Sequence, residues 1–495
     1  DTMDERIRCC ALMDYRYRSR EPLSDRIVSS LVFFFVILQP LLDIASYFSI
    51  VKGFPNISLA VRTLLLGSIA ALSIIAAQKK WHVWLFYGVI ALFWAVHMLI
   101  CYQSGYRDPV SDFTYFIKIV QIPIYTFGFF LFFLRYPNCG VSFQLGVTVN
   151  IYIISLSIIL AAVTNTMSHT YWYTQRGILG WFYSGNAQSA ILAAMLPIAL
   201  VYTQKISRWF FGVTVLLGFG NLFLIGTRVA YGSIFIIAFG MAAAFLWSWA
   251  KKKKGRWWKS LLLVLAVLIL CAGGYTISPM YQSREEHREY MEEKQAYQEQ
   301  QIIEYPGDDP YAAYRELYQT YCQELVDTFG LENTLKRYDY STDIQVISDA
   351  RLKKRNFAQM QWERKSNATH WMGYEYETFM AGNTSMEPEN DFHVIFYLYG
   401  YVGLGLFFCF LLGIVGWGIK RLWSRQAKWS NTLWACMLSG ALMMGSSLLA
   451  GHTLVRPNVS VYLSLILALG MYLLKETGKK RMDAEYPEEG KHFAD

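Results

Sequence analysis

The sequence predicts an all-α polytopic membrane protein with about twelve transmembrane helices and one long helical loop outside the membrane. Of its 495 residues, 54% are hydrophobic and only 17% are charged. A soluble domain of this length normally carries more charge. Apolar runs of 18 or more residues recur along the whole chain, and such runs have the length of membrane-spanning helices rather than of barrel strands.

The apolar runs divide the chain into five parts. These are an N-terminal tail (1–26), nine spans (27–277), a long polar loop (278–391), three further spans (392–474) and a C-terminal tail (475–495). The individual spans are expected at roughly 27–50, 57–77, 81–102, 113–134, 143–163, 186–203, 209–225, 229–249, 260–277, 392–416, 432–450 and 458–474.

Lysine and arginine predict the orientation. If the N-terminal tail lies in the cytoplasm, the inside segments hold 26 of the 45 basic residues, including six in the block 251–259. The short connections on the other side hold only five. Because cytoplasmic flanks are enriched in Lys and Arg, both termini are expected to be cytoplasmic. The cytoplasmic flanks also explain the net charge of +8, so this charge does not indicate nucleic-acid binding.

Residues 278–391 differ from every other connection. They contain 22 Asp and Glu against 12 Lys and Arg, a net charge of −10. Apolar residues recur at three- and four-residue spacing between Tyr311 and Phe329, which predicts an amphipathic helix against the membrane or the helix bundle. A second helix is expected from Arg351 to Trp362, and a turn from Asn383 to Pro388. A loop of this length is commonly a functional lid or binding element.

Ionisable residues gather where this loop meets the tenth span. Glu389, Asp391 and His393 lie within five residues. On a helix, Glu389 and His393 would share a face, and a carboxylate beside an imidazole suits proton transfer. Alternatively, these residues form an acidic helix start that complements the helix dipole, with a histidine at the membrane interface.

Several cations are expected on the outer side, where the positive-inside rule disfavours them. A basic site at headgroup depth would suit a phosphorylated lipid, and the planar fork of arginine binds phosphate oxygens in pairs. The alternative is snorkelling or local ion pairing, for example between Arg62 and the intramembrane Asp43. These cations are Arg62, Lys118, Arg176, Arg228 and Arg456, the last beside His452.

Other kinds of site have little support. The eight cysteines show neither a metal-ligand spacing nor a disulfide framework, and no nucleotide-binding signature is visible. The histidines His82, His97, His169 and His287 have no partner in sequence. We therefore expect neither a metal nor a cofactor.

Four stretches resemble motifs of the O-antigen ligase-like membrane proteins, a superfamily of O-antigen ligases and Wzy-type polysaccharide polymerases. Arg176–Asn186 is similar to the family's "R-x-G-x-F…N" loop, and Gly226–Gly232 to its "T-x-S-R-G" span entry without the serine. Ser348–Arg351 is similar to "S-G-R". The fourth stretch resembles "H-N-x-x-L…G-x-x-G" in Asn390, Gly400 and Gly403, with Glu389 in place of the histidine.

The resemblance implies a GT-C-like fold and an inverting, metal-independent glycosyltransferase. Its donor would be a glycan on undecaprenyl diphosphate at the outer face of the bacterial cytoplasmic membrane. Its acceptor would be a hydroxyl of a glycan or a lipid. Whether such an enzyme acts as a ligase or a polymerase stays open.

Within that reading, Glu389 or His393 takes the acceptor proton, and Asp391 orients His393 or an arginine. The leaving diphosphate is stabilised by cations, namely Arg228, Arg351 and Arg176, with Arg62 and Arg456 on the same face. Two alternatives remain. One is a lipid-linked oligosaccharide flippase or transporter without glycosyl transfer, and the other is a membrane protein whose loop binds a partner.

Overall fold

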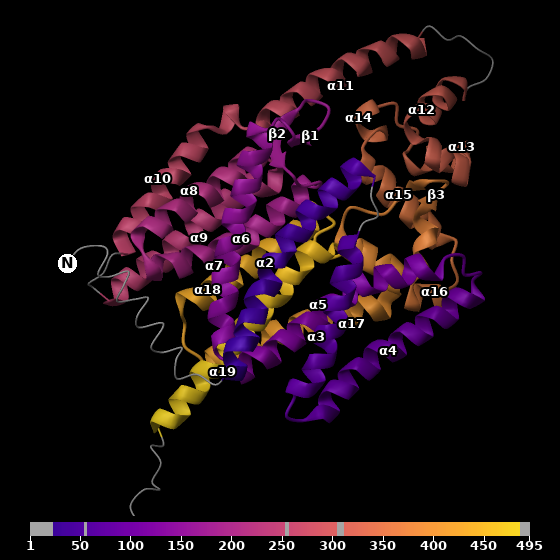
Figure 1. Ribbon diagram of the computed structural model, residues 1–495. Coiled ribbons are helices and arrows are strands. Elements are labelled where there is room, and N and C mark those ends of the chain that lie inside the picture. Colours follow the sequence, from indigo (N-terminus) through magenta and orange to yellow (C-terminus); the bar gives the residue numbers. More distant parts are fainter. Residues whose placement is uncertain (1–22, 54–56, 253–256, 304–310, 486–495) are drawn as a thin grey trace, which may run out of the picture.

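The computed structural model describes residues 23–53, 57–252, 257–303 and 311–485 and is almost entirely helical (Figure 1). Within these residues, eleven helices are long and apolar enough to cross a membrane, and a twelfth apolar helix, α10, is shorter. The twelve coincide with the twelve predicted spans. They are α2 (Leu23–Lys52), α3 (Ile57–Ala76), α4 (Lys80–Gln103), α5 (Pro109–Arg135), α6 (Asn138–Val163), α7 (Gly185–Ile206), α8 (Arg208–Ile225), α9 (Arg228–Lys252), α10 (Trp257–Gly273), α17 (Asp391–Trp423), α18 (Asn431–Leu449) and α19 (Pro457–Glu485).

The two predicted tails lie partly outside the described residues. Residues 1–22 and 486–495 belong to them. Helix α2 begins at Leu23, inside the predicted N-terminal tail, and α19 continues to Glu485, inside the predicted C-terminal tail.

Helix α7 is the centre of the bundle. In its most apolar window 78% of the residues are buried, although it contains Pro197. It packs against α6, α8, α9, α18 and α19. In α3, α4 and α17 the corresponding share is 11%, so these helices leave most of their apolar surface for lipid.

The polar segment between α10 and α17 folds into short elements at one end of the bundle, which we call the loop end. The predicted helices at 311–329 and 351–362 are present. The predicted turn from Asn383 to Pro388 is confirmed only at its start, because the chain turns at 382–383 and then forms strand β4 (Thr384–Ser385). The elements are η1 (Tyr275–Ile277), α11 (Pro279–Ile303), α12 (Ala312–Phe329), α13 (Leu331–Arg337), α14 (Ile344–Ile347), α15 (Ala350–Glu363), α16 (Asn367–Met372), η2 (Tyr376–Phe379), β3 (Met380–Ala381) and β4 (Thr384–Ser385).

The expected docking of α12 against the membrane or the bundle is wrong. Its apolar residues Leu317, Tyr318 and Leu325 are buried in a core that the loop forms by itself. Helices α13, α14 and α15 supply the other side of this core. The loop is therefore a small folded layer with its own apolar interior.

A hairpin that the sequence did not predict lies between α6 and α7. Its strands β1 (Ser168–Tyr171) and β2 (Arg176–Gly180) are antiparallel, with Tyr171 opposite Arg176. The hairpin packs against α6, α8 and α11, so it also belongs to the loop end.

Helix α17 is interrupted at Gly400, where φ is 63° and ψ is −165°. A side chain at Gly400 would collide with the backbone carbonyl of Trp371, and one at Gly373 with that of Leu398. The break leaves the Tyr397 carbonyl free to accept a hydrogen bond from the Tyr374 amide at 3.1 Å. Glycine is needed here because the loop backbone approaches the helix backbone directly.

Candidate functional site

The start of α17 lies among residues of the α18–α19 turn. Asn390 caps the helix through Oδ1, which accepts from the amides of Phe392 and His393, and its Nδ2 donates to the Leu448 carbonyl at 3.1 Å. Because Glu389 precedes this cap, the expectation that Glu389 and His393 share a helix face is wrong. His393 lies in the first turn of α17, where it is partly buried.

Asp391 contacts the backbone rather than His393. Its Oδ2 accepts from the amides of Thr453 and Leu454 at 2.8 and 2.9 Å, and its side chain is fully buried. The expected orienting contact with His393 or an arginine is therefore replaced by an anchor that holds the α18–α19 turn.

Arg351 and Glu389 form an ion pair with an Nε–Oε2 distance of 2.6 Å. Asp349 caps α15 and places Arg351 in its first turn, which explains the aspartate in the Ser348–Arg351 motif. The guanidinium also donates to the Leu449 carbonyl at 3.1 Å, and the Lys354 ammonium lies 3.8 Å from Glu389 Oε1. The side chain of Arg351 is half exposed, so this pair faces accessible space.

A second carboxylate of the site, Glu387, was not among the residues predicted from the sequence. It is 7% exposed and accepts a hydrogen bond from the Tyr115 hydroxyl at 2.9 Å. Its Oε1 lies 3.5 Å from Nδ1 of His452, and Lys118 lies 3.5 Å above the Tyr115 ring. Glu387 stands two residues before Glu389, but Tyr115 is 272 residues away, so only the fold reveals the group.

Burial sets the protonation of this pair. It raises the pKa of the Glu387 carboxyl, although the hydrogen bond from Tyr115 and the charge of Lys118 oppose the shift. It lowers the pKa of His452 to about 3, and the charges of Arg456, Lys354 and Lys118 act in the same direction. His452 is therefore neutral at physiological pH.

His452 makes the protein sensitive to acid. Its pKa is about 3 in the folded protein against 6.5 as the ordinary value, so the unfolded chain binds the proton first as the pH falls. Stability is fully present above pH 6.5 and declines below it, by about 2 kcal/mol at pH 5. His452→Gln should remove this loss. Melting temperatures at pH 7 and pH 5 measure it, with the exposed His82→Gln as the control. An equal drop in wild type and His452→Gln would contradict the assignment.

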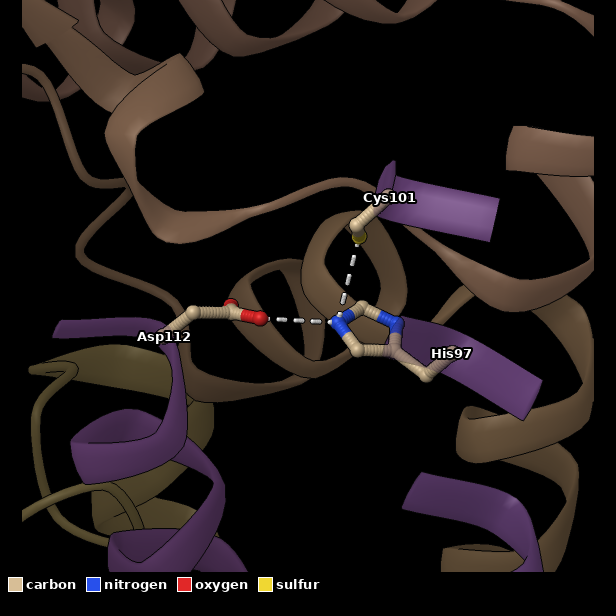
Figure 2. A group of neighbouring side chains, drawn as sticks. All are labelled: His97, Cys101 and Asp112. Carbon is tan, nitrogen blue, oxygen red and sulfur yellow. Dashed lines mark hydrogen bonds and ion pairs between the residues drawn. The ribbon is translucent and has the colours of Figure 1, made fainter. Parts of the chain in front are cut away.

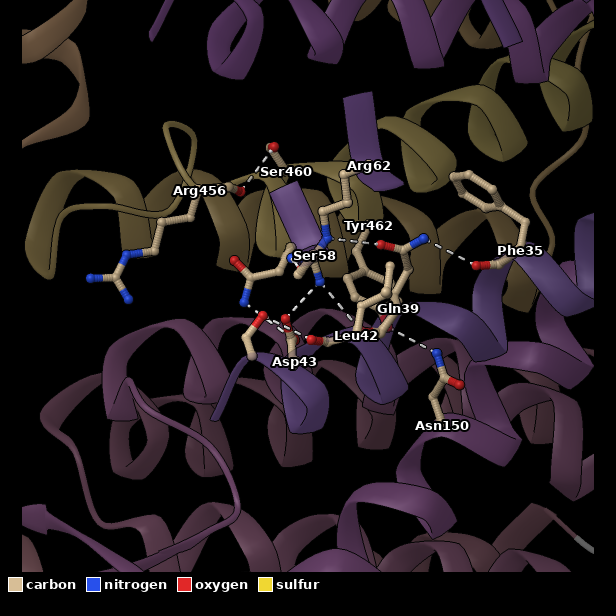
Figure 3. A network of polar contacts seen from close by, with 12 residues as sticks. Phe35, Gln39, Leu42, Asp43, Ser58, Arg62, Asn150, Arg456, Ser460 and Tyr462 are labelled. Atoms are coloured by element: carbon tan, nitrogen blue, oxygen red, sulfur yellow. Dashed lines mark hydrogen bonds and ion pairs between the residues drawn. The ribbon is translucent and has the colours of Figure 1, made fainter. Parts of the chain in front are cut away.

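Arg456 is a cation without a protein partner for its guanidinium among the described residues, and Figure 3 shows this group pointing away from the neighbouring network. Its charge acts on the buried carboxylates Glu387, Asp391 and Asp43. An unpaired guanidinium beside a mostly buried site is well suited to bind a phosphate group.

Arg62 differs from Arg456, because all three nitrogens of its guanidinium contact oxygen atoms of the protein. It pairs with Asp43 at 2.7 Å, donates to Ser58 at 2.6 Å, and reaches the side-chain and backbone oxygens of Gln39 at 3.4 Å (Figure 3). The other carboxylate oxygen of Asp43 accepts from Asn458 at 3.3 Å. The alternative expected for Arg62, a local ion pair with Asp43, is thus confirmed.

Arg176 and Arg228 lie at the part of the loop end that contains the β1–β2 hairpin, which we call the hairpin side. Arg176 lies on β2 and donates through Nε and one terminal nitrogen to Glu286 of α11, at 3.2 and 2.8 Å. Arg228 is exposed at the start of α9, close enough to Tyr171 for its charge to act on that hydroxyl. Neither makes a hydrogen bond or ion pair with Arg351, Glu389 or Arg456 in the described structure. Within the family-like loop, Asn186 reaches the Ala450 carbonyl at 3.4 Å.

A buried cluster joins α4, α5 and the loop, contrary to the expectation that His97 is alone (Figure 2). His97 Nδ1 contacts the Met372 carbonyl at 2.8 Å and Nε2 contacts Asp112 at 3.0 Å, with Cys101 Sγ 3.5 Å away. Asp112 also accepts from the Tyr106 hydroxyl and the Tyr376 amide. These three side chains are metal-ligating types. Their hydrogen bonds already account for the histidine and carboxylate atoms, and we interpret the cluster as a structural tie.

The fold and this site define a polytopic helical membrane protein whose ionisable groups lie at one end of the bundle, beside a folded helical loop. The profile of the O-antigen ligase like membrane protein family matches residues 25–477, and the chain belongs to this family. Membership of this family places the protein among membrane glycan-processing enzymes. No curated protein matches the chain.

Proposed function

We propose that the protein is an inverting, metal-independent glycosyltransferase of the O-antigen ligase or polysaccharide polymerase type. It transfers a glycan from undecaprenyl diphosphate to an acceptor hydroxyl of a glycan or lipid. The loop end faces outward from the bacterial cytoplasmic membrane, and both termini lie in the cytoplasm. Family membership and the Lys and Arg distribution support this assignment.

The ion pair between Arg351 and Glu389 carries the proposal. It combines, within 2.6 Å, a carboxylate suited to accept a proton and a guanidinium suited to bind phosphate. Lys354 and the guanidinium of Arg456 add positive charge around the same turn. Such fixed cations can stabilise the negative charge that grows on a leaving diphosphate.

Donor binding activates the base in this mechanism. The diphosphate competes with Glu389 for Arg351, since a guanidinium binds phosphate oxygens through the same paired donors. Once Arg351 has turned to the diphosphate, Glu389 loses its main counter-charge and becomes a stronger base. It then takes the proton of the acceptor hydroxyl as that oxygen attacks the anomeric carbon, and the diphosphate departs from the opposite face.

The remaining groups have supporting roles. His393 is the alternative base, one helical turn from the cap of α17. Asp391 positions the α18–α19 turn and hence Arg456. Arg228 and Arg176 line the hairpin side, where they contact the donor glycan or its diphosphate. The loop covers the reacting groups and excludes water that would hydrolyse the donor.

The test uses protein in nanodiscs with undecaprenyl-diphosphate-linked glycan extracted from native membranes. Free undecaprenyl diphosphate and glycan transfer are followed in EDTA for wild type, Glu389→Gln and His393→Ala. Coupled release that is lost in Glu389→Gln and kept in His393→Ala is expected. The reverse pattern would make His393 the base. If no release occurs with any native acceptor fraction but the lipid moves between leaflets, the protein is a flippase instead.

A further inference from the structure

A groove lies within the membrane-spanning helices, in the half of the bundle far from the loop end. The groove lies between α4, α5, α17 and α19 and has a volume of about 540 Å³, in the range of sites for small ligands. Its walls are almost entirely apolar, mainly aromatic. Residues lining it include Phe86, Phe127, Phe130, Phe410, Ile414 and Trp417.

The groove exists because α4 and α17 diverge. Near the loop end the two helices touch, with the ring of Phe93 6.1 Å from that of Tyr399 and close against Gly403. Toward the opposite end, Phe86 of α4 packs on Phe127 of α5 with ring centroids 5.0 Å apart, and Phe410 of α17 lines the same groove. Figure 1 shows the α3–α4 pair at the margin of the bundle.

Two cations lie at the mouth of this groove, at the end of the bundle opposite the loop end. Arg421 donates Nε to the Leu474 carbonyl at 3.1 Å, and in the described structure its terminal nitrogens have no hydrogen-bond partner. Its guanidinium lies 5.4 Å above the Trp417 ring, and the Lys475 ammonium lies 5.6 Å above the Phe130 ring. Both charges are therefore held over aromatic faces at the mouth, open to an anion.

A buried hydroxyl points to a second polar group of the ligand. Thr126 lines the groove, is 1% exposed, and its hydroxyl has no hydrogen-bond partner in the described structure. A helical threonine usually donates to the carbonyl four residues earlier, and an unpaired hydroxyl is costly in an apolar setting. Thr126 lies one helical turn, about 6 Å along the helix axis, from Phe130, whose ring the Lys475 ammonium faces.

We propose that this groove binds an anionic glycerophospholipid from the leaflet opposite the loop end. Arg421 and Lys475 hold the headgroup phosphate, the Thr126 hydroxyl donates to an ester carbonyl, and one acyl chain fills the aromatic groove. The ligand has these three features in the same order as the site: a phosphate at the cations, an ester at the Thr126 hydroxyl, and a hydrocarbon chain along the aromatic residues. The site is separate from the loop end and does not depend on the proposed glycosyl transfer.

The experiment is lipid titration followed by native mass spectrometry of the full protein, with phosphatidylglycerol and phosphatidylethanolamine compared. Wild type should retain one phosphatidylglycerol preferentially. Arg421→Gln with Lys475→Gln should weaken phosphatidylglycerol binding about 30-fold, because each lost cation reduces the affinity for an anionic lipid about 5-fold. Thr126→Val, which keeps the shape, should weaken binding of both lipids several-fold without changing their ratio.

Two glycine substitutions on α17 distinguish lipid binding in the groove from lipid binding elsewhere on this helix. Gly413 lines the groove and Gly416 does not, and a side chain at either meets nothing within 4 Å. Gly413→Phe should abolish retention of the lipid, whereas Gly416→Phe should not. The charge control is Lys420→Gln with Lys428→Gln, two exposed cations at the same end outside the groove. Equal phosphatidylglycerol binding in wild type, Gly413→Phe and the Arg421/Lys475 variant would overturn the proposal. Equal retention of the two lipids by wild type would overturn its anionic specificity.

Discussion

Arg351→Ala should reduce glycan transfer about 10³-fold while leaving the protein folded in the membrane. Removing one positioned donor from developing negative charge typically costs this much in rate. The stability cost should be small, about 0–1 kcal/mol, because the Arg351 side chain is half exposed and screened by solvent. Transfer rates in nanodiscs and melting temperatures of the same preparations measure the two effects.

Two further variants distinguish chemistry from structure at this pair. Lys336→Ala breaks an exposed ion pair with Glu332 elsewhere in the loop and should leave transfer unchanged. Exchanging the charges, with Arg351→Glu and Glu389→Arg, restores an ion pair but moves both the base and the phosphate ligand. It should stay inactive. Recovery of transfer in the exchanged variant would mean that the pair acts only by holding the loop to the bundle.

Arg62→Ala should destabilise the protein by about 3–5 kcal/mol, the largest stability effect we expect from one charge. Asp43 would remain inside the membrane-spanning part of the bundle without its main partner, since both side chains are only 11% exposed. Removing one member of a buried ion pair leaves an uncompensated charge, and this costs far more than losing the attraction alone. The free energy of unfolding in mixed micelles measures the loss.

The double variant Asp43→Asn with Arg62→Gln is the matched control. It keeps polar groups of similar size at both positions but removes both charges, so it should recover most of the stability. Normal stability of Arg62→Ala combined with lost donor binding would contradict the structural role and return Arg62 to the diphosphate site.

Periodicity and apolar length were sufficient to predict the spans because they express a local requirement. A membrane-spanning segment must satisfy its own backbone hydrogen bonds and present apolar side chains, and both conditions are met within one run of residues. All twelve predicted spans therefore correspond to helices, including α7, which contains Pro197, and the shorter α10. The helices α12 and α15 of the loop were predicted for the same reason.

Pairings between distant residues could not be predicted in this way. The sequence placed Glu389 and His393 on one helix because it showed their spacing but not the cap at Asn390, which excludes Glu389 from α17. It placed α12 against the membrane or the helix bundle because an apolar face does not identify its partner, which is the loop's own core. The hairpin of β1 and β2 is too short for a clear alternating pattern.

By itself, the sequence determined the all-helical membrane fold, the long loop and the grouping of cations toward one face. Only the tertiary structure decided what each ionisable group does. It paired Arg62 with Asp43, Arg351 with Glu389 and Arg176 with Glu286, and it brought Glu387 to Tyr115 and His452. It left the Arg456 guanidinium without a partner among the residues that the structure describes. The physical reason is that helix formation depends on neighbours along the chain. The energy of a charge depends on its burial and on partners that are distant in sequence.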